Sequence, residues 1–331
     1  MAGAAGLRPG RHDPDLPDTP AVRSRFTKQR GNHGGTGYPQ LRLLALVACG
    51  TRTLIDAVFG PTTTGETTYA PLLLRSLHPG MIVLADRNIG AKDLLADIAA
   101  TGAHVLVRLK IGRKLAVLRR FPDGSYLSML GTLRVRIIEC EITIATPAGR
   151  RTGVYRLATT LLDHRRYPAG ELITLYHQRW EIETAYLELK SSILGGRVLR
   201  ARTATGVEQE VYALLVTYQL LRTAMADATA TNADPDRASF SIAWQTARDQ
   251  LIQAANVITD TTVDLVGTIG RHVLANLMPD RRLRACPRIV KRAISKYQAR
   301  GPNIDRTSYK ATVRIDILAG EPPGPPTKVL N

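Results

Sequence analysis

One stretch of the sequence decides the fold, and it reads Tyr176-His177-Gln178-Arg179-Trp180-Glu181-Ile182-Glu183-Thr184-Ala185-Tyr186-Leu187-Glu188-Leu189-Lys190. We predict a single helix over residues 172–193 around it. At about 100° per residue, four polar side chains of this helix fall within about 60° of one another and form one stripe. They are Tyr176, Arg179, Glu183 and Lys190. Glu181 and Glu188 fall on the opposite face, where we expect solvent-facing acids.

The stripe presents one carboxylate between two cations and a phenol. A carboxylate can bind a metal ion, and Arg, Lys and Tyr side chains hydrogen-bond phosphate oxygens. The alternative is a surface ion-pair row of Glu183 with Arg179 and Lys190, which is common on helices and contributes little stability. From these residues alone, the ion-pair row is the simpler interpretation, and both stay open.

The composition indicates a globular protein that attracts polyanions. The hydrophobic fraction is 44%, and 45 Lys and Arg against 28 Asp and Glu give a net charge of +17. Nucleic acid is the first partner to consider, although an anionic membrane surface would suit the charge equally well. No apolar run approaches the ~20 residues of a spanning helix, and no secretory signal is visible. We therefore expect no membrane and a cytoplasmic, nucleoid-associated protein.

The three cysteines, Cys49, Cys140 and Cys286, are far apart and lack the short spacing of metal ligands. This excludes a zinc knuckle and a disulfide framework, and we expect small buried apolar residues. A metal site would have to use oxygen ligands, which suit magnesium or manganese.

The part of the chain before the stripe has an α/β pattern. Residues 1–38 are rich in Pro, Gly and charge and predict a loop. Apolar runs predict strands over 41–49, 53–59, 81–86 and 104–109. Helical spacing predicts helices over 64–77 and 91–100. Strands joined by helical crossovers predict a layered α/β core.

In the rest of the chain the sequence pattern changes first to strands and then to helices followed by a basic segment. Residues 114–167 alternate in the manner of strands and predict a separate β-rich insertion. Further helices are predicted over 207–228, 239–257 and 263–277. The segment from Arg281 to Arg314 holds eleven Lys or Arg and one acid, Asp305. We interpret it as a solvated basic arm that grips DNA backbone, with a solubilising tail as the equal alternative.

The order Tyr, two residues, Arg, three residues, Glu, six residues, Lys resembles the signature helix of the IS-four family of insertion-sequence transposases, which are of the DDE type. The resemblance implies that Glu183 is the third acid of the catalytic triad. It also implies that Tyr176, Arg179 and Lys190 contact DNA near the cleaved bond.

A second segment, Gly80-Met81-Ile82-Val83-Leu84-Ala85-Asp86-Arg87, is similar to the second-acid strand of the same family. Taken alone, Asp86 could merely cap the helix that begins near Ala91. The resemblance, which spans about residues 17–228, implies that it is the second catalytic acid.

The implied fold is an RNase H-like mixed α/β sheet flanked by helices, with a β-rich insertion before the third-acid helix and a helical C-terminal region. We place the core at 39–112 and 168–230, the insertion at 113–167, and the helical region with its basic tail at 231–331.

The implied reaction is cleavage and strand transfer of DNA by phosphoryl transfer. Asp86 and Glu183 would bind Mg²⁺ or Mn²⁺, with two ions about 4 Å apart in such sites. Arg179 and Lys190 would offset the charge on the phosphate. The partners would be double-stranded DNA, as element terminal repeats and target, with a homodimer on paired ends.

The first acid departs from the family pattern. Pro17-Asp18-Thr19-Pro20 is similar to a family segment, but no apolar strand ending in Asp-Gly precedes it. Asp13, Asp15 and Asp18 are nearby, and none matches the family position. We therefore expect a missing opening strand, truncation at the amino terminus and weak or no activity. The alternative function is a catalytically inactive transposase remnant that only binds DNA.

Overall fold

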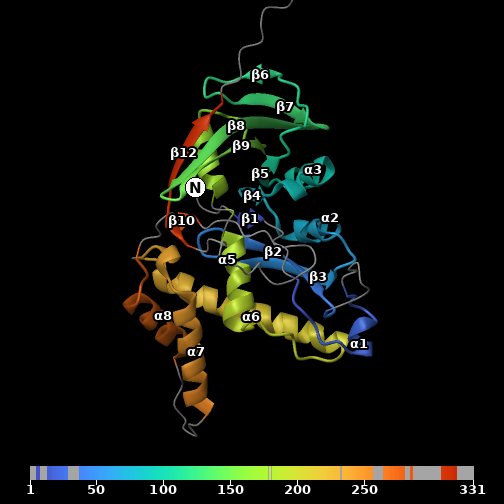
Figure 1. Cartoon of the computed structure of the whole chain (residues 1–331), viewed down its shortest axis with the longest axis vertical. Coiled ribbons are helices and arrows are strands. Elements are labelled where there is room, and N and C mark those ends of the chain that lie inside the picture. Colours follow the sequence, from blue (N-terminus) through green and yellow to red (C-terminus); the bar gives the residue numbers. More distant parts are fainter. Residues whose placement is uncertain are drawn as a thin grey trace, which may run out of the picture. The chain divides into compact units, whose positions relative to one another are not determined.

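The computed structural model describes residues 5–7, 13–28, 37–177, 179, 181–231, 233–255, 264–279, 284–285 and 307–318 (Figure 1). The chain divides into two compact units. The first unit comprises residues 1–82 and 178–282, and the second comprises residues 83–177 and 283–331. Both units combine strands and helices, so the predicted mixed α/β class is confirmed.

The first unit contains an antiparallel sheet with the order β1-β2-β3. Its strands are β1 (Ala5–Leu7), β2 (Leu41–Ala48) and β3 (Leu54–Pro61). β2 is almost entirely buried, and all of its residues except Arg42 are apolar. The predicted hairpin of β2 and β3 is therefore confirmed. Its turn contains Gly50 with φ 90° and Arg52 with φ 59°, in the left-handed region.

A short strand, β1, precedes β2, contrary to the prediction of a loop over residues 1–38. β1 pairs antiparallel with the end of β2, with Ala5 opposite Ala48 and Leu7 opposite Leu46. Three residues are too few to show a periodicity, and the pairing with β2 supplies the backbone hydrogen bonds that define the strand. The loop prediction was therefore wrong for residues 5–7, whereas the sequence before Pro17 contains no apolar strand that ends in Asp-Gly.

The described part of the first unit also contains α-helices. They are α1 (Pro20–Arg23), α2 (Glu66–Tyr69), α5 (Glu181–Leu187), α6 (Ala204–Thr229), α7 (Phe240–Ala255) and α8 (Leu265–Ala275). One buried apolar cluster joins β2 to α5, α6, α7 and α8. The predicted helix over 64–77 continues after α2 as the 3-10 helix η1 (Ala70–Ser76), where Pro71 lacks the amide proton that an α-turn requires.

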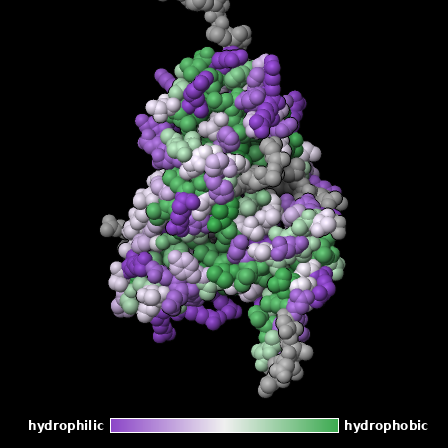
Figure 2. All heavy atoms as spheres, turned by 180° about the vertical axis from the view of Figure 1, so that it is seen from behind, coloured by the Kyte–Doolittle hydropathy of each residue, from purple (hydrophilic) through white to green (hydrophobic). Residues whose placement is uncertain are grey.

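The second unit contains a seven-stranded sheet with the order β4-β5-β9-β8-β7-β6, and β12 pairs with β8. Its strands are β4 (Ile82–Ala85), β5 (His104–Leu109), β6 (Arg119–Arg120), β7 (Tyr126–Leu130), β8 (Leu133–Thr146), β9 (Gly149–Thr159) and β12 (Thr312–Ile317). Helices α3 (Lys92–Ala100) and α4 (Ala169–His177) pack on β5. Hydrophilic side chains cover much of the upper part of the face in Figure 2.

The strands of the predicted insertion, residues 113–167, do not form a sheet of their own. β9 pairs with β5, from Leu106 opposite Thr159 to Leu109 opposite Arg156. The insertion therefore continues the sheet that begins with β4 and β5, and the domain boundaries given above stay a prediction.

The end of the predicted basic arm is a strand. β12 pairs with β8 from Thr312 opposite Ala145 to Ile317 opposite Cys140, and this pairing includes Arg314. Residues 312–314 of the predicted arm are therefore part of a strand, although Thr312 and Arg314 are exposed. Residues 286–306 of the arm lie outside the described part of the chain. Short strands β10 (Arg284–Ala285) and β11 (Tyr309–Lys310) pair with each other.

Two further expectations concern the cysteines and membrane-spanning helices. Cys140 is buried, and burial raises the pKa of its thiol to about 11, whereas Cys49 is half-buried and Cys286 lies outside the described residues. None of the helices that the structure describes is long and apolar enough to cross a membrane.

Candidate active site

Asp86 lies directly after the buried strand β4, and its side chain is half-buried. Its Oδ1 accepts a hydrogen bond of 2.8 Å from the amide of Arg87, so it caps the 3-10 turn η2 (Arg87–Ile89). The alternative of a cap on the helix near Ala91 was wrong, because the cap position of α3 is Ala91 itself and carries no side-chain hydrogen bond.

Tyr176 joins α4 to the end of β4. Its ring is buried, and its hydroxyl donates a hydrogen bond of 3.2 Å to the carbonyl oxygen of Ala85, the residue before Asp86. Tyr176 and Asp86 are thus brought close together within the second unit.

The start of α4 is held by a buried ion pair. Asp123 Oδ2 accepts hydrogen bonds from Arg136 Nη2 at 2.5 Å and from the amide of Ala169 at 3.2 Å. Arg136 Nη1 donates to the carbonyl oxygen of Tyr167 at 2.7 Å. Since Ala169 begins α4, the pair fixes the helix that carries Tyr176.

Glu183 lies on the exposed face of α5 in the first unit. The opposite face is buried, with helical spacing: Ile182, Ala185, Tyr186 and Leu189. Tyr186 adds a hydrogen bond, because its hydroxyl accepts from the amide of Ala45 in β2 at 3.0 Å. α5 is therefore fixed against β2, and the Glu183 carboxylate faces outward.

The four signature residues do not form one exposed stripe. Glu183 and Lys190 are exposed, whereas Tyr176 and Arg179 are buried. The predicted α-helix over 172–193 is not continuous, because Arg179 is in a 3-10 turn between α4 (Ala169–His177) and α5 (Glu181–Leu187). Gln178 and Trp180 lie outside the described residues.

A second interruption follows Leu187, where the α-helix becomes the π-helix η4 (Glu188–Ile193). The amide of Leu194 donates to the carbonyl oxygen of Leu189 at 3.1 Å, the spacing that defines a π-turn. Gly195 and Gly196 then end the helix with φ of 60° and 71°, which glycine adopts without strain. Lys190 thus lies in a turn whose register differs from that of an α-helix.

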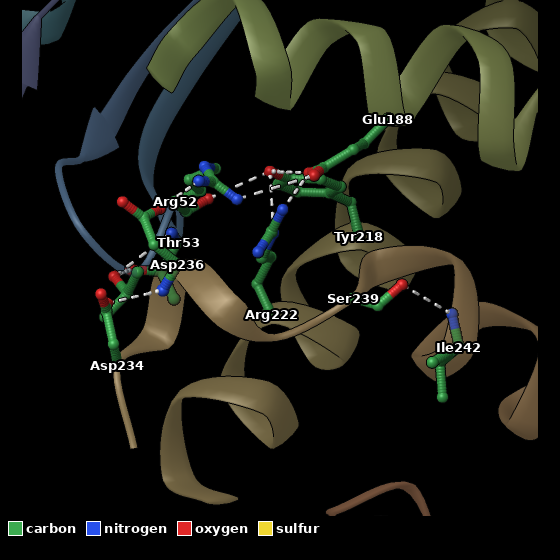
Figure 3. A network of polar contacts seen from close by, with 10 residues as sticks. Arg52, Thr53, Glu188, Tyr218, Arg222, Asp234, Asp236, Ser239 and Ile242 are labelled. Carbon is green, nitrogen blue, oxygen red and sulfur yellow. Dashed lines mark hydrogen bonds and ion pairs between the residues drawn. The ribbon is translucent and has the colours of Figure 1, made fainter. Parts of the chain in front are cut away.

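Glu188 does not face solvent, contrary to the prediction (Figure 3). Its Oε2 accepts a hydrogen bond from Arg222 Nη2 and lies 3.2 Å from the hydroxyl of Tyr218, and its Oε1 is 3.9 Å from Arg52 Nη1. Arg52 also forms an ion pair with Asp236. The two arginines are each 2% exposed and the Glu188 side chain is 12% exposed. The prediction of a solvent-facing Glu188 was therefore wrong, and the side chain of Glu181 lies outside the described residues.

A signal for this cluster was present in the sequence. Arg222 lies on the same helical face as the apolar residues Leu221 and Met225 of α6, all of which are buried. A buried arginine needs a carboxylate partner. Helical periodicity alone shows that Arg222 needs an acidic partner, but it does not show which acid pairs with it.

The three acids near β1 differ in their surroundings. Asp15 Oδ1 accepts a hydrogen bond of 2.9 Å from Gln40 Nε2. Asp18 pairs with Lys28 at 2.5 Å and with Arg23 at 3.4 Å. The buried carboxylate of Asp13 lies 3.8 Å from Arg42 Nε of β2.

The donor chemistry of the two candidate acids fits a hard divalent cation. Asp86 is half-buried and Glu183 is exposed, so both offer carboxylate oxygens of the kind that magnesium and manganese prefer. Within the described parts of the chain, no group of three or more His, Cys, Asp or Glu side chains gathers into a metal site.

Comparison with known proteins identifies the class. The transposase DDE domain family matches residues 18–220, more than half of the chain, so the chain belongs to this family. The predicted resemblance to the IS-four family and the predicted RNase H-like fold class are confirmed.

A relative in Escherichia coli (strain K12) is the transposase InsG for insertion sequence element IS4. The two sequences are 27% identical over 292 residues, which cover 85% of this chain and 66% of the relative. The chain therefore spans just under two thirds of that relative's length.

Proposed function

We propose that this protein is a DNA transposase that cleaves and joins DNA at the ends of an insertion sequence by metal-dependent phosphoryl transfer. The observation that carries the proposal is the family match over residues 18–220, which contains both Asp86 at the end of β4 and the exposed Glu183 on α5. The alternative of an inactive remnant is not favoured, because the family match and the similarity to a named transposase both indicate a transposase.

Asp86 and Glu183 are the residues that would hold the metal, and Mg²⁺ or Mn²⁺ is the ion that their oxygen atoms suit. Bound there, a divalent ion makes a water molecule more acidic and offsets charge on the scissile phosphate. Tyr176 keeps the end of β4 in place through Ala85, and the fixed helix α5 keeps Glu183 in its outward direction.

The cationic signature residues would bind DNA. Lys190 is exposed on η4 and can reach a phosphate oxygen, and we assign Arg179 and Tyr176 to the same DNA-binding set on the family pattern. Charge-assisted hydrogen bonds from Lys190 and Arg179 would stabilise the phosphate as negative charge grows on it.

Double-stranded DNA is the proposed partner, as terminal repeats and as target. The net charge of +17 supports this, and exposed arginines are added by the β7–β9 region of the second unit. They include Arg134, Arg150 and Arg151. The proposal also includes that the protein forms a homodimer on paired DNA ends and is located at the nucleoid.

The test is magnesium-dependent nicking of DNA that carries the inverted repeats flanking the gene. The wild type is expected to nick this DNA, and Glu183→Gln and Asp86→Asn are expected to lose nicking by at least about 100-fold. Glu171→Gln, an exposed acid on α4, is the matched control and should keep wild-type activity. Wild-type nicking by Glu183→Gln would exclude the assignment.

The first acid can be found in the same assay. Asp13→Asn, Asp15→Asn and Asp18→Asn are compared for nicking and for the unfolding midpoint. The first acid is the residue whose substitution abolishes nicking without lowering the unfolding midpoint. A remnant that only binds DNA would show no nicking in the wild type and unchanged DNA affinity in all variants.

A further inference from the structure

The buried cluster around Glu188 lies next to the signature residues without being one of them. Glu188 is the first residue of the π-helix η4, and Lys190 follows two residues later. Around Glu188 the cluster gathers Arg52 from the β2–β3 turn, Arg222 from α6, and Asp236 from the 3-10 helix η5 (Pro235–Arg237) (Figure 3). All of these segments belong to the first unit.

A π-turn requires tertiary support. It is rare because its hydrogen bonds are less favourable than those of an α-helix, and it occurs mostly as single turns at functional sites. Here the turn begins at Glu188, which pairs with Arg222 of α6 and Arg52 of the β2–β3 turn. The register of η4 is therefore coupled to these two arginines.

The chemistry of the cluster indicates that it positions side chains and backbone rather than adding stability. A buried ion pair could be replaced by apolar side chains without loss of stability, so such a pair is weak evidence for stabilisation. The Glu188–Arg222 pair is directional, because Arg222 donates to one carboxylate oxygen of Glu188 and also to the hydroxyl of Tyr218 at 3.2 Å. Burial raises the pKa of Tyr218, so its hydroxyl remains a donor.

We propose that Glu188 is a positioning residue: its ion pairs with Arg222 and Arg52 hold the π-register of η4 and so set the direction in which Lys190 points. The proposal rests on the proposed function for the role of Lys190 in DNA binding. If the turn relaxed to an α-helix, the Lys190 side chain would change direction relative to α5, because the two kinds of helix advance by different angles per residue.

The first experiment measures the register directly, by hydrogen exchange of the full chain. The amide of Leu194 makes the π-type bond to Leu189, so Glu188→Gln is expected to speed its exchange at least about tenfold. Asp236→Asn is the matched control, because it removes an acid from Arg52 without touching η4. Its exchange at Leu194 should stay within about twofold of the wild type.

The second experiment is a double-mutant cycle on affinity for duplex DNA. Lys190→Ala and Glu188→Gln are each expected to weaken binding about tenfold, and the double variant to bind no more weakly than either. Additive losses would overturn the proposal, because they would mean that Glu188 acts independently of Lys190. Glu188→Asp keeps the charge and should recover part of the affinity.

The outcomes separate this proposal from the proposed function. If Lys190→Ala leaves DNA affinity unchanged, the DNA role of Lys190 fails, and exchange at Leu194 alone decides the role of Glu188. Unchanged exchange in Glu188→Gln, or equal acceleration in Asp236→Asn, would overturn the positioning role. All variants are compared below the unfolding midpoint of the least stable one.

Discussion

The hydroxyl of Tyr176 donates a hydrogen bond to the carbonyl oxygen of Ala85 at 3.2 Å, and Ala85 directly precedes Asp86. A buried helix residue thus fixes the point at which the chain leaves β4. The Asp123–Arg136 pair in turn holds the start of this helix. Asp86, the proposed second acid, therefore lies on a segment fixed by its own unit, as a reactive carboxylate requires.

Tyr176→Phe tests this bond. We expect the free energy of unfolding to fall by about 1 kcal/mol, because the buried carbonyl of Ala85 loses its donor. Nicking should slow as the end of β4 gains freedom. The control is Tyr155→Phe, a half-buried tyrosine of the same unit whose ring contacts Arg108. Equal unfolding midpoints for the two variants would contradict a stabilising role for the Tyr176 hydroxyl.

Arg52 combines a strained backbone with buried ion pairs. Its φ of 59° is in the left-handed region, which is unfavourable for residues other than glycine by roughly 1–2 kcal/mol. Arg52→Ala and Arg52→Gly both remove the pairs with Asp236 and Glu188. Both should be destabilised by about 3 kcal/mol or more, with the glycine variant more stable than the alanine variant by about 1 kcal/mol. Urea unfolding of the two variants measures the difference, and the reverse order would contradict the strain.

The Asp123–Arg136 pair makes stability depend on pH. Burial alone would raise the pKa of Asp123, but hydrogen bonds from Ser125 and the charge of Arg136 outweigh it and hold the pKa below the ordinary 3.8. Because the folded pKa is lowered, this stabilisation is present above pH 3.8 and is lost as the pH falls through the folded pKa.

Asp123→Asn should therefore be less stable than the wild type at pH 7, by about 2 kcal/mol. The difference should shrink as the pH falls from about 5 to about 2. Thermal unfolding across this range measures it, with the exposed Asp227→Asn as control. A difference that stays constant with pH would show that the charge of Asp123 contributes nothing.

The basic arm is expected to contribute to the salt dependence of DNA binding. Deleting it would also remove β12, so the better test neutralises charges: Arg288, Lys291, Arg292, Lys296 and Arg300 each to Gln. The slope of log affinity against log salt should flatten by up to about 0.9 for each phosphate that the variant no longer neutralises. Exchanging the same Arg and Lys residues for one another keeps the charge and should keep the slope. An unchanged slope in the neutralised variant favours a solubilising tail.

Local sequence patterns predicted the elements whose burial follows from a continuous apolar run. β2, β3, β4, α3 and β5 all appear close to the expected positions, because runs and turns within a few residues decide them. The family and the outward face of Glu183 also followed from local spacing.

Long-range contacts decide the features that the sequence did not reveal. Glu188 looks like a surface acid until Arg222 and Arg52 are placed beside it, and the π-turn depends on the same partners. β12 exists because β8 offers an edge, although the alternation of Val313, Ile315 and Ile317 was a usable signal. Periodicity assumes one continuous helix, so it could not predict the 3-10 turn at Arg179.

The central claim is that the Glu183 carboxylate binds the catalytic metal ion, and nicking by Glu183→Cys in different metals tests it most directly. A thiolate suits a softer ion, so the variant should be inactive with Mg²⁺ and regain measurable nicking with Mn²⁺ or Zn²⁺. Thr184→Cys, the adjacent residue on α5, should behave as the wild type with every metal. Full activity of Glu183→Cys with Mg²⁺ would contradict the account.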